Sequence, residues 1–353
     1  MLSDSSYLKP KWVFVVDTKH SALWRSAVAH SRKSHVVVIA ATEYFSPLSL
    51  AKDIALVDPE FVVFSWRPAF DSIVFSIAPK EVIRSTGALI LLLVPDHAGL
   101  DFNQQREQAR ILLSDGLLVT SELLREEYSR RYKVKKIQVL HDLPDIELIE
   151  SIKSRESLKK AREVIWVGNS RWGERLGYKD HKGFKRFVIP ARKALESLDK
   201  SSSFKIIDSS FGKLPYKEVL ESIRDASCLI ITSDSEGTCL PLIEACALGT
   251  PVVTFDVGIA GELLIDELQS QISPRNLRIF TELIVETLSN RDEISRRAIM
   301  RFDSYRHSVE TDLHQLNFTT DTKGGWREAR VERFSRNSLL WKLRWLKNFT
   351  KAS

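Results

Sequence analysis

Short apolar runs recur along the chain, with longer mixed segments between them. In the first part of the chain these runs are β-branched or leucine-rich and do not alternate with polar residues, as expected of parallel strands that are buried on both faces. The segments between them are long enough for crossover helices, and 20–32 and 122–132 have helix-like patterns. This alternation predicts a doubly wound α/β domain. Its strands are expected at 12–16, 35–40, 61–65, 88–94, 116–120 and 137–140.

A charged, helix-favouring segment interrupts the pattern between residues 145 and 162, and the alternation then restarts. We place a domain boundary in this segment. The chain is therefore predicted to form two Rossmann-like, doubly wound α/β domains, residues 1–150 and 151–320. The second domain is expected to hold strands 164–167, 204–207, 228–231 and 251–255, and helices 183–198, 216–224, 241–248, 276–288 and 291–302.

Length and composition agree with a two-domain globular protein. The chain has 353 residues, of which 43% are hydrophobic and 28% charged, and it is too long for one ordinary core. The three cysteines lack metal-ligand spacing, so we expect no metal site and a reducing, cytoplasmic compartment. No apolar leader follows Met1, and the run 88–94 is far shorter than the roughly 20 residues that span a bilayer.

The net charge of +6 is concentrated in a C-terminal tail, residues 321–353. Nine Lys or Arg and two Asp or Glu lie within 323–353, so the body is close to neutral and a nucleic-acid groove is not expected there. If 336–351 is helical, a basic face lies beside a face rich in Trp and Leu, which suits an anionic membrane surface. The alternative is a terminal helix that packs on the body with its basic side chains in solvent.

The stretch from Ser233 to Glu262 contains a polar turn, the start of a predicted helix and a second, glycine-containing turn. Pro241 suits the first turn of that helix, and the free N–H groups before it could hold a phosphate with help from the helix dipole. Glu236 lies before Pro241 and Glu244 after it. Carboxylates bind hydroxyls rather than phosphate. These groups together suit a nucleotide sugar, although the helix dipole alone could also favour the two glutamates.

Several motifs in this half occur together. The spacing of Glu236 and Glu244, two carboxylates separated by seven residues, is one of them. The others are Ser235-Glu236-Gly237, Gly249-Thr250-Pro251-Val252-Val253, Gly258 to Glu262, Trp166-Val167-Gly168-Asn169-Ser170-Arg171 and Asp180-His181-Lys182-Gly183-Phe184. The combination resembles the nucleotide-binding domain of retaining glycosyltransferases with the GT-B fold, most closely family 4, the glycosyl transferases group 1. The resemblance covers roughly residues 164–264 well and the rest of the chain only as architecture. The GT-B fold that it implies has the two domains facing each other across a cleft.

The resemblance implies roles for the matching residues. Glu236 would contact the transferred sugar, and Arg171 and Lys182 would neutralise the diphosphate. His97, which follows the fourth predicted strand, would contact the donor sugar from the other domain. Charge that develops on the leaving nucleoside diphosphate would be stabilised by fixed cations and aligned amides, without a metal or another cofactor. Lys182 could instead be a solvated lysine at a helix start, and His97 a loop histidine.

The rest of the donor would be held by the glycine turns and the second carboxylate. Glu244 would bind the ribose hydroxyls. The full set of implied donor-binding residues is Gly168, Gly237, Thr238, Cys239, Leu240 and Glu244.

The acceptor is expected on the N-terminal domain. Asp17 and Lys19 lie in the turn after the first strand. Arg67 lies after the third strand, where it could line the cleft or only the end of the sheet. In the family the first of these turns is usually rich in glycine, but residues 17–20 contain none. The turn therefore departs from the family pattern.

The sequence thus predicts a metal-independent, retaining hexosyltransferase that transfers a sugar from a nucleotide sugar to a glycan or lipid-linked acceptor. A role in envelope or surface glycan synthesis is expected, in the cytoplasm or on the inner face of the membrane. Two alternatives stay open: a nucleotide-sugar 2-epimerase with the same fold, and a non-catalytic subunit that partners another transferase. The altered turn 17–20 is the feature that keeps the second alternative open.

Overall fold

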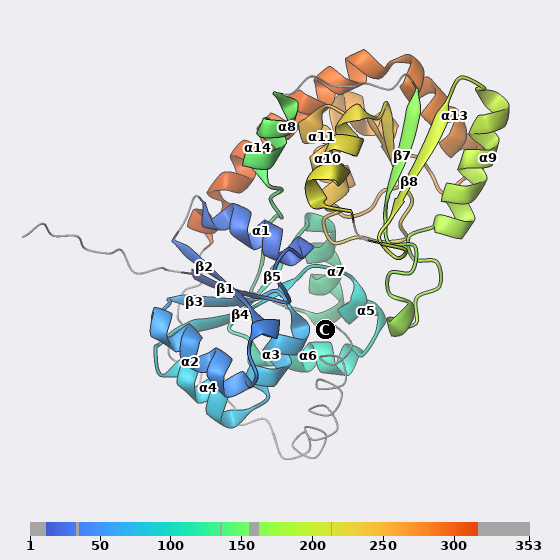
Figure 1. The fold of residues 1–353 in the computed structure, drawn as a ribbon. Coiled ribbons are helices and arrows are strands. Elements are labelled where there is room, and N and C mark those ends of the chain that lie inside the picture. Colours follow the sequence, from blue (N-terminus) through green and yellow to red (C-terminus); the bar gives the residue numbers. More distant parts are fainter. Residues whose placement is uncertain (1–11, 33–34, 135, 155–161, 213, 317–353) are drawn as a thin grey trace, which may run out of the picture.

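The computed structural model describes residues 12–32, 35–134, 136–154, 162–212 and 214–316, with side chains described except at 310–315. Two α/β lobes lie one above the other in Figure 1. We call the lobe built on strands β1 to β6 the N-terminal lobe and the one built on β7 to β10 the C-terminal lobe. The predicted tail 321–353, with its amphipathic segment 336–351, lies outside the described residues.

The N-terminal lobe has a six-stranded parallel sheet in the order β2-β1-β3-β4-β5-β6. Each strand lies within one residue of its predicted position, so the non-alternating apolar runs were a reliable signal. Both faces are covered, because Val13 and Val15 pack towards helices α2, α3 and α4 while Phe14 and Val16 pack towards α1. The strands are β1 (Trp12–Val16), β2 (Val36–Ala40), β3 (Phe61–Phe64), β4 (Leu89–Val94), β5 (Gly116–Val119) and β6 (Ile137–Val139).

Serine side chains begin several helices of this lobe. Ser21, Ser46 and Ser121 each accept a hydrogen bond from the backbone N–H three residues later, as N-cap residues do. The helices are α1 (Ala22–Ser31), α2 (Pro47–Val57), α3 (Arg67–Val74), α4 (Ile77–Arg84), α5 (Ala98–Asp101), α6 (Gln104–Leu113) and α7 (Glu122–Tyr132), with a 3-10 turn η1 (Ala41–Glu43).

The C-terminal lobe has a four-stranded parallel sheet in the order β10-β9-β7-β8. Its strands and helices follow the predicted alternation. The strands are β7 (Glu163–Gly168), β8 (Ser203–Asp208), β9 (Cys228–Ile231) and β10 (Val252–Thr254). The helices are α8 (Ile146–Lys153), η2 (Glu174–Leu176), η3 (Phe184–Val188), α9 (Ile189–Leu198), α10 (Tyr216–Asp225), α11 (Leu240–Leu248), α12 (Ala260–Leu263), η4 (Asp266–Gln271), α13 (Leu277–Ser289) and α14 (Arg291–Gln315).

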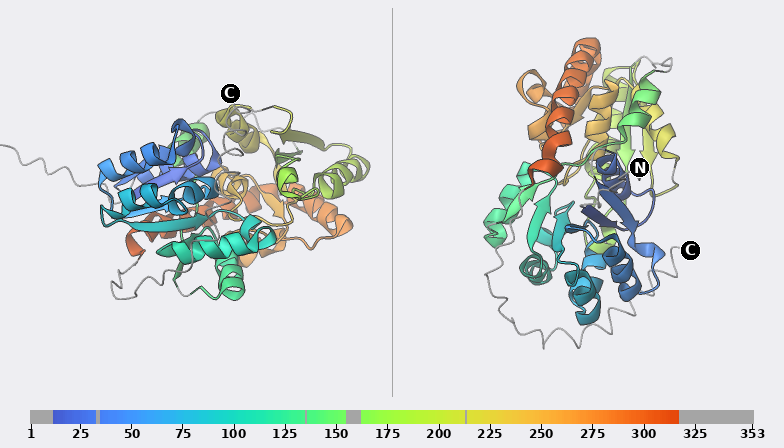
Figure 2. Two further views of the ribbon diagram at one scale, coloured as in Figure 1. Left: turned by 90° about the horizontal axis from the view of Figure 1, so that it is seen from below. Right: turned by 90° about the vertical axis from the view of Figure 1, so that its left-hand side faces the viewer.

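Two helices connect the lobes. Helix α8 contains the predicted boundary at residue 150 and packs against α10 and α11 of the C-terminal lobe. Helix α14 was predicted to end at residue 302 but continues to Gln315, because Tyr305 and Val309 are buried one and two turns further on. Figure 2 shows it lying along the C-terminal lobe and ending beside the N-terminal one. There Leu316 packs against the apolar cluster on the α1 face of the first sheet.

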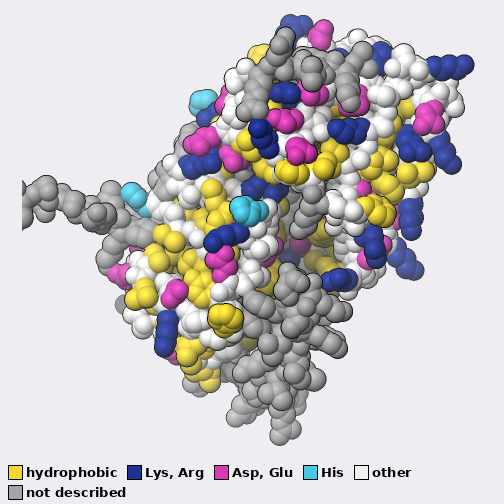
Figure 3. Space-filling model, in the orientation of Figure 1, with side chains coloured by type: hydrophobic (Ala, Val, Ile, Leu, Met, Phe, Trp, Pro, Cys, Tyr) yellow, Lys and Arg dark blue, Asp and Glu magenta, His cyan; other side chains and the backbone are white. Residues whose placement is uncertain are grey.

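The two lobes differ in their surfaces. On the face shown in Figure 3, apolar side chains gather on the N-terminal lobe, whereas basic and acidic side chains are mixed over the C-terminal lobe. The most exposed large apolar residues of the N-terminal lobe include Phe45, Leu56 and Ile77, at the ends of α2 and α4. In the part of the chain that the structure describes, no helix combines the length and apolar character needed to cross a membrane.

Candidate functional site

A cavity of about 400 Å³ lies between the lobes, at the carboxyl ends of β4, β7 and β9. Ligands of parallel α/β sheets bind at this edge, where crossover helices begin. Eight of the predicted site residues line the cavity, and they come from both lobes. They are His97, Gly168, Lys182, Glu236, Gly237, Thr238, Cys239 and Leu240.

Lys182 and Glu236 form an ion pair in the cavity wall. Ser233 donates a hydrogen bond of 2.5 Å to the same carboxylate oxygen. Burial acts to raise the pKa of the Glu236 carboxyl, but Lys182 and Ser233 outweigh it and hold the pKa below its ordinary value. Lys182 is the only lysine or arginine among the described residues that line the cavity. A single, partly buried cation is therefore available among these lining residues, already paired with a carboxylate.

The next residue, Gly183, explains how the backbone places Lys182. Its φ is +63°, and a Cβ at this position would lie 2.2 Å from the backbone oxygen of Thr232. The missing side chain lets the two segments touch, and Thr232 Oγ1 donates a 2.7 Å hydrogen bond to the Lys182 carbonyl. Lys182 is therefore held directly beside the end of β9.

The turn before α11 places backbone groups at the cavity. Cys239 adopts a left-handed conformation with φ of +72° at the N-cap, and α11 begins at Leu240 with Pro241 in its first turn. Thr238 is fixed from the opposite lobe, because its hydroxyl donates a 2.7 Å hydrogen bond to Asp142. The N-terminal N–H groups of a helix attract anions, so this wall of the cavity suits a phosphate.

His97 forms part of the opposite wall. It is 7% exposed, and its Nε2 lies 2.9 Å from a carboxylate oxygen of Glu127 on α7. Its Nδ1 is buried and has no hydrogen-bond partner among the described residues. The ring therefore keeps one nitrogen unused beside the cavity.

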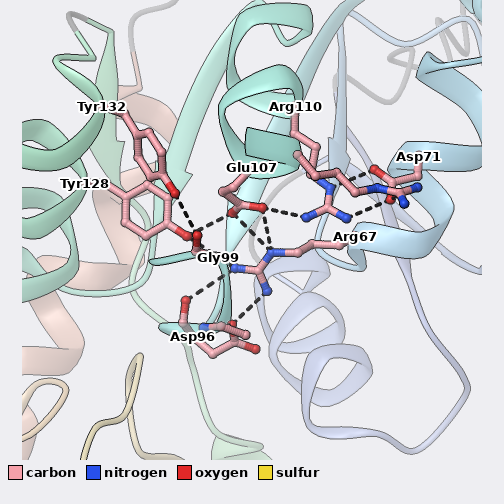
Figure 4. A network of polar contacts seen from close by, with 10 residues as sticks. Arg67, Asp71, Asp96, Gly99, Glu107, Arg110, Tyr128 and Tyr132 are labelled. Atoms are coloured by element: carbon pink, nitrogen blue, oxygen red, sulfur yellow. Dashed lines mark hydrogen bonds and ion pairs between the residues drawn. The ribbon is translucent and has the colours of Figure 1, made fainter. Parts of the chain in front are cut away.

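A buried ion network supports the loop that carries His97 (Figure 4). Arg67 donates to Asp96 at 2.7 Å and to the fully buried Glu107 at 3.1 Å. Glu107 also accepts from Arg110 at 2.6 Å and from the Tyr128 hydroxyl at 2.9 Å. Burial acts to raise the pKa values of the Asp96 and Glu107 carboxyls, but the arginines outweigh it and lower both.

This network changes the interpretation of Arg67. We predicted that Arg67 faces the acceptor, but its guanidinium is bound within the N-terminal lobe and does not line the cavity. The other two acceptor-side residues are also engaged locally. Asp17 accepts a 2.5 Å hydrogen bond from Ser21, and Lys19 pairs with Glu43 at 2.7 Å. The first residues of α1, Ala22 and Leu23, line the cavity in their place.

Two predicted donor residues of the C-terminal lobe also lie outside the cavity lining. The Arg171 side chain is 66% exposed and pairs with Glu174 at 3.0 Å. Glu244 is buried in α11 and accepts a 2.6 Å hydrogen bond from the Tyr216 hydroxyl. Burial raises the pKa of the Glu244 carboxyl, and the bond from Tyr216 only partly offsets this effect.

An aromatic group that the sequence reading missed completes the cavity wall. Trp172 lines the cavity, and its ring contacts those of His181 at 4.6 Å and Tyr178 at 5.5 Å between centroids. Burial, with the nearby Lys182 cation, lowers the pKa of His181. Trp172 follows Arg171 directly, and the cluster of Trp, Tyr and His between two motifs was the available signal.

Within the described residues, no group of three or more His, Cys, Asp or Glu side chains is arranged to hold a metal ion. The polar groups of the cavity are instead suited to a ligand that carries both hydroxyls and a phosphate.

Comparisons with known proteins agree with the two-lobed fold. Residues 209–301, which include Glu236 and α11, match the family of glycosyl transferases group 1. The chain is similar in structure to sucrose-phosphate synthase of Thermosynechococcus elongatus, with 13% identity, a TM-score of 0.60, and coverage of 87% of this chain and 98% of that chain. It is also similar to HepE of Anabaena in complex with UDP-glucose, with 12% identity and a TM-score of 0.59. That match covers 86% of this chain and 98% of the HepE chain.

A third similar structure is TarM of S. aureus, with 15% identity and a TM-score of 0.56. The match covers 74% of this chain and 55% of the TarM chain, so the present chain spans about half the length of that protein. No curated protein matches the chain in sequence. The fold is therefore GT-B, the two-lobed fold of these glycosyltransferase structures, and the resemblance that the motifs indicated is confirmed.

The approach of the lobes depends on Gly237. A Cβ at this position would lie 1.9 Å from the Pro95 carbonyl oxygen and 2.9 Å from Thr120 Oγ1, both in the opposite lobe. We therefore expect Gly237→Ala to push the lobes apart and to increase the radius of gyration measured by small-angle X-ray scattering. Gly212→Ala is the matched control, because no atom lies within 4 Å of a Cβ there. Identical scattering from the two variants would contradict the contact.

Glu107 should be a major source of stability in the N-terminal lobe. Glu107→Gln removes the buried charge that pairs with Arg110, which is buried, and with Arg67, which is partly buried, and breaking a buried pair costs about 3–5 kcal/mol. We expect a clearly lower melting temperature, whereas Glu126→Gln, an exposed change on α7, should have little effect.

The pH dependence gives this prediction a second readout. Because the pKa of Glu107 is lowered in the folded protein, its contribution is complete above the unfolded value of about 4.3 and is lost as pH falls through the folded value. The difference in melting temperature between wild type and Glu107→Gln should therefore shrink in acid. A difference that is constant from neutral pH to acid would indicate a steric effect instead.

Proposed function

We propose that the protein is a retaining glycosyltransferase, which transfers a sugar from a nucleotide sugar to a glycan or lipid-linked acceptor. The observation that carries the proposal is the Lys182–Glu236 pair in the cavity between the lobes, next to the N-terminus of α11. Glu236 and α11 lie inside the segment that matches glycosyl transferases group 1. The cavity thus combines a carboxylate for hydroxyls with a cation and helix amides for phosphate.

The similar structures suggest the first donors to test. HepE was solved with UDP-glucose, and a TarM variant was solved with UDP, fondaparinux and alpha-GlcNAc-glycerol. We propose a nucleoside-diphosphate hexose as donor, and UDP sugars are the natural starting point.

The proposed reaction follows from the charges in the cavity. The bond between the anomeric carbon and the diphosphate oxygen breaks, and negative charge develops on that oxygen. Lys182 and the N-terminal amides of α11 stabilise this negative charge, while Glu236 holds hydroxyls of the transferred sugar. An acceptor hydroxyl then bonds to the anomeric carbon from the same face and gives its proton to the leaving diphosphate. No further cofactor enters this scheme.

Two of the implied donor contacts require a change from the present arrangement. Glu244 would bind the ribose hydroxyls only after the Tyr216 hydroxyl moves away from it. Arg171 would reach the diphosphate only if its loop turned inwards, away from Glu174. Lys182 already lines the cavity and has only to exchange its partner Glu236 for the diphosphate, so we assign the main charge stabilisation to it.

The acceptor is proposed to enter from the N-terminal lobe, past Ala22 and Leu23. The basic tail supports an acceptor at an anionic membrane surface, such as a lipid-linked or envelope glycan, with the protein on the cytoplasmic side.

The activity can be tested by incubating the protein with a panel of nucleotide sugars, with and without membrane extract, and measuring nucleoside diphosphate release. We expect turnover with one donor class, and a loss in kcat of about 10²–10³ in Lys182→Ala, the order found when one group stabilising such a charge is removed. Glu236→Gln should also reduce turnover strongly. Lys185→Ala is the matched control, because Lys185 is exposed on η3 and does not line the cavity.

Other outcomes separate the alternatives. Formation of an epimer of the donor sugar would favour a nucleotide-sugar epimerase. Donor binding without turnover would favour a non-catalytic partner subunit, which the engaged, glycine-free turn 17–20 would fit. Full activity in Lys182→Ala would refute the proposed role of the cavity.

The tail has its own test. Deleting residues 337–353 removes several basic and aromatic residues, so binding to vesicles that contain anionic lipid should fall sharply in a sedimentation assay. Binding to neutral vesicles should be weak with or without these residues. Equal binding of both proteins to anionic vesicles would refute the membrane role.

A further inference from the structure

The segment between β7 and η3 crosses the space between the lobes. It includes η2 and brings Trp172, Tyr178 and His181 together. The Tyr178 hydroxyl donates a hydrogen bond to Asp101 of the N-terminal lobe, and its ring meets Phe102 edge-on at 4.6 Å. The segment is therefore attached to α5, directly after the loop that carries His97.

This attachment fixes an indole ring at the cavity. Trp172 is partly exposed, lines the cavity and packs against the rings of His181 and Tyr178. His181 is itself held, because its Nε2 lies 3.0 Å from the Ser235 carbonyl oxygen. The indole is thus held by tilted ring packing, with 31° and 35° between the ring planes, while the residue remains part of the cavity wall.

The position of Trp172 relative to the charged pair identifies the part of the ligand that it faces. The Lys182 Nζ lies 5.2 Å from the centroid of the Trp172 ring, and the same Nζ is paired with Glu236. The carboxylate proposed to hold sugar hydroxyls is therefore next to the indole. Glu244 and Tyr216, proposed to be at the ribose end, do not line the cavity.

We propose that Trp172 is a specificity-determining residue that stacks on the pyranose ring of the donor. This inference rests on the proposed function. The face of an aromatic ring carries partial negative charge, and the axial C–H groups on one face of a pyranose carry partial positive charge, so the two surfaces attract. Glu236 binds the hydroxyls around the sugar ring while Trp172 covers its apolar face. A sugar whose axial hydroxyl interrupts that face would stack less well.

The link to Asp101 adds a condition to this recognition. Because Tyr178 joins the segment to the N-terminal lobe, the indole lies over the cavity when the lobes are together. Sugar stacking and lobe closure should then favour each other.

The experiment compares the affinities of UDP and of the preferred UDP sugar by isothermal titration calorimetry, with the full-length chain. Trp172→Ala should lower the affinity for the nucleotide sugar by roughly tenfold, the upper range for a single aromatic contact. The affinity for UDP should not change. Trp172→Phe keeps an aromatic face, so it should lose less affinity for the nucleotide sugar than Trp172→Ala does. Trp24→Phe is the matched control, because Trp24 lies on α1 and does not line the cavity.

Tryptophan fluorescence gives a readout that does not need turnover. The nucleotide sugar should change the emission of the wild type more than UDP does, and this extra change should be absent in Trp172→Phe. A melting curve for each variant shows that it is folded.

The outcomes separate this inference from the proposed function. The stacking role would be overturned if Trp172→Ala lowered the affinities for UDP and for the nucleotide sugar equally, or lowered neither. Turnover by the wild type would in that case still support the proposed function. If the wild type binds no nucleotide sugar of the panel, the proposed function fails and the role of Trp172 fails with it.

Discussion

The two lobes meet at a contact between backbones, where Gly237 lies against the carbonyl of Pro95. The absence of a side chain lets the loop after β9 reach the loop after β4. Glu262 of the C-terminal lobe also holds the two lobes together. Its carboxylate accepts a 2.8 Å hydrogen bond from the Glu122 N–H at the start of α7 and lies 2.8 Å from His141 Nε2. Since the cavity is bounded by these loops, their separation determines what can fit between His97 and Lys182.

The charged residues of the two lobes have different partners and surroundings. In the N-terminal lobe Arg67 and Arg110 are fully engaged by Asp96, Asp71 and Glu107, so the network gives rigidity to the His97 loop rather than charge to a ligand. In the C-terminal lobe the Lys182–Glu236 pair lines the cavity. In the proposed reaction a phosphate would replace the Glu236 carboxylate as the partner of Lys182.

The strands and most long helices could be predicted because apolar runs buried on both faces leave a strong local pattern. The cavity-lining motif residues were found through the resemblance. The engagement of Arg67 within its own lobe could not be predicted, because its partner Glu107 is 40 residues away and nothing local indicates that contact. The hydrogen bond between Glu244 and Tyr216 is equally non-local. Trp172 was missed because it lies between two motifs, and its place in the cavity depends on Tyr178 reaching the other lobe.

Helix α14 has a consequence for how the chain is made. Tyr305 donates a hydrogen bond to the Asp142 carbonyl, and Leu316 joins the apolar cluster on the α1 face of the first sheet. The first lobe is therefore covered in part by residues that are synthesised late. Parallel sheets already fold slowly because their contacts span long crossovers. As the chain leaves the ribosome, the α1 side of the first sheet must wait for the whole second lobe before it is complete. Premature termination within α14 would therefore leave an apolar surface exposed on a lobe far away in sequence.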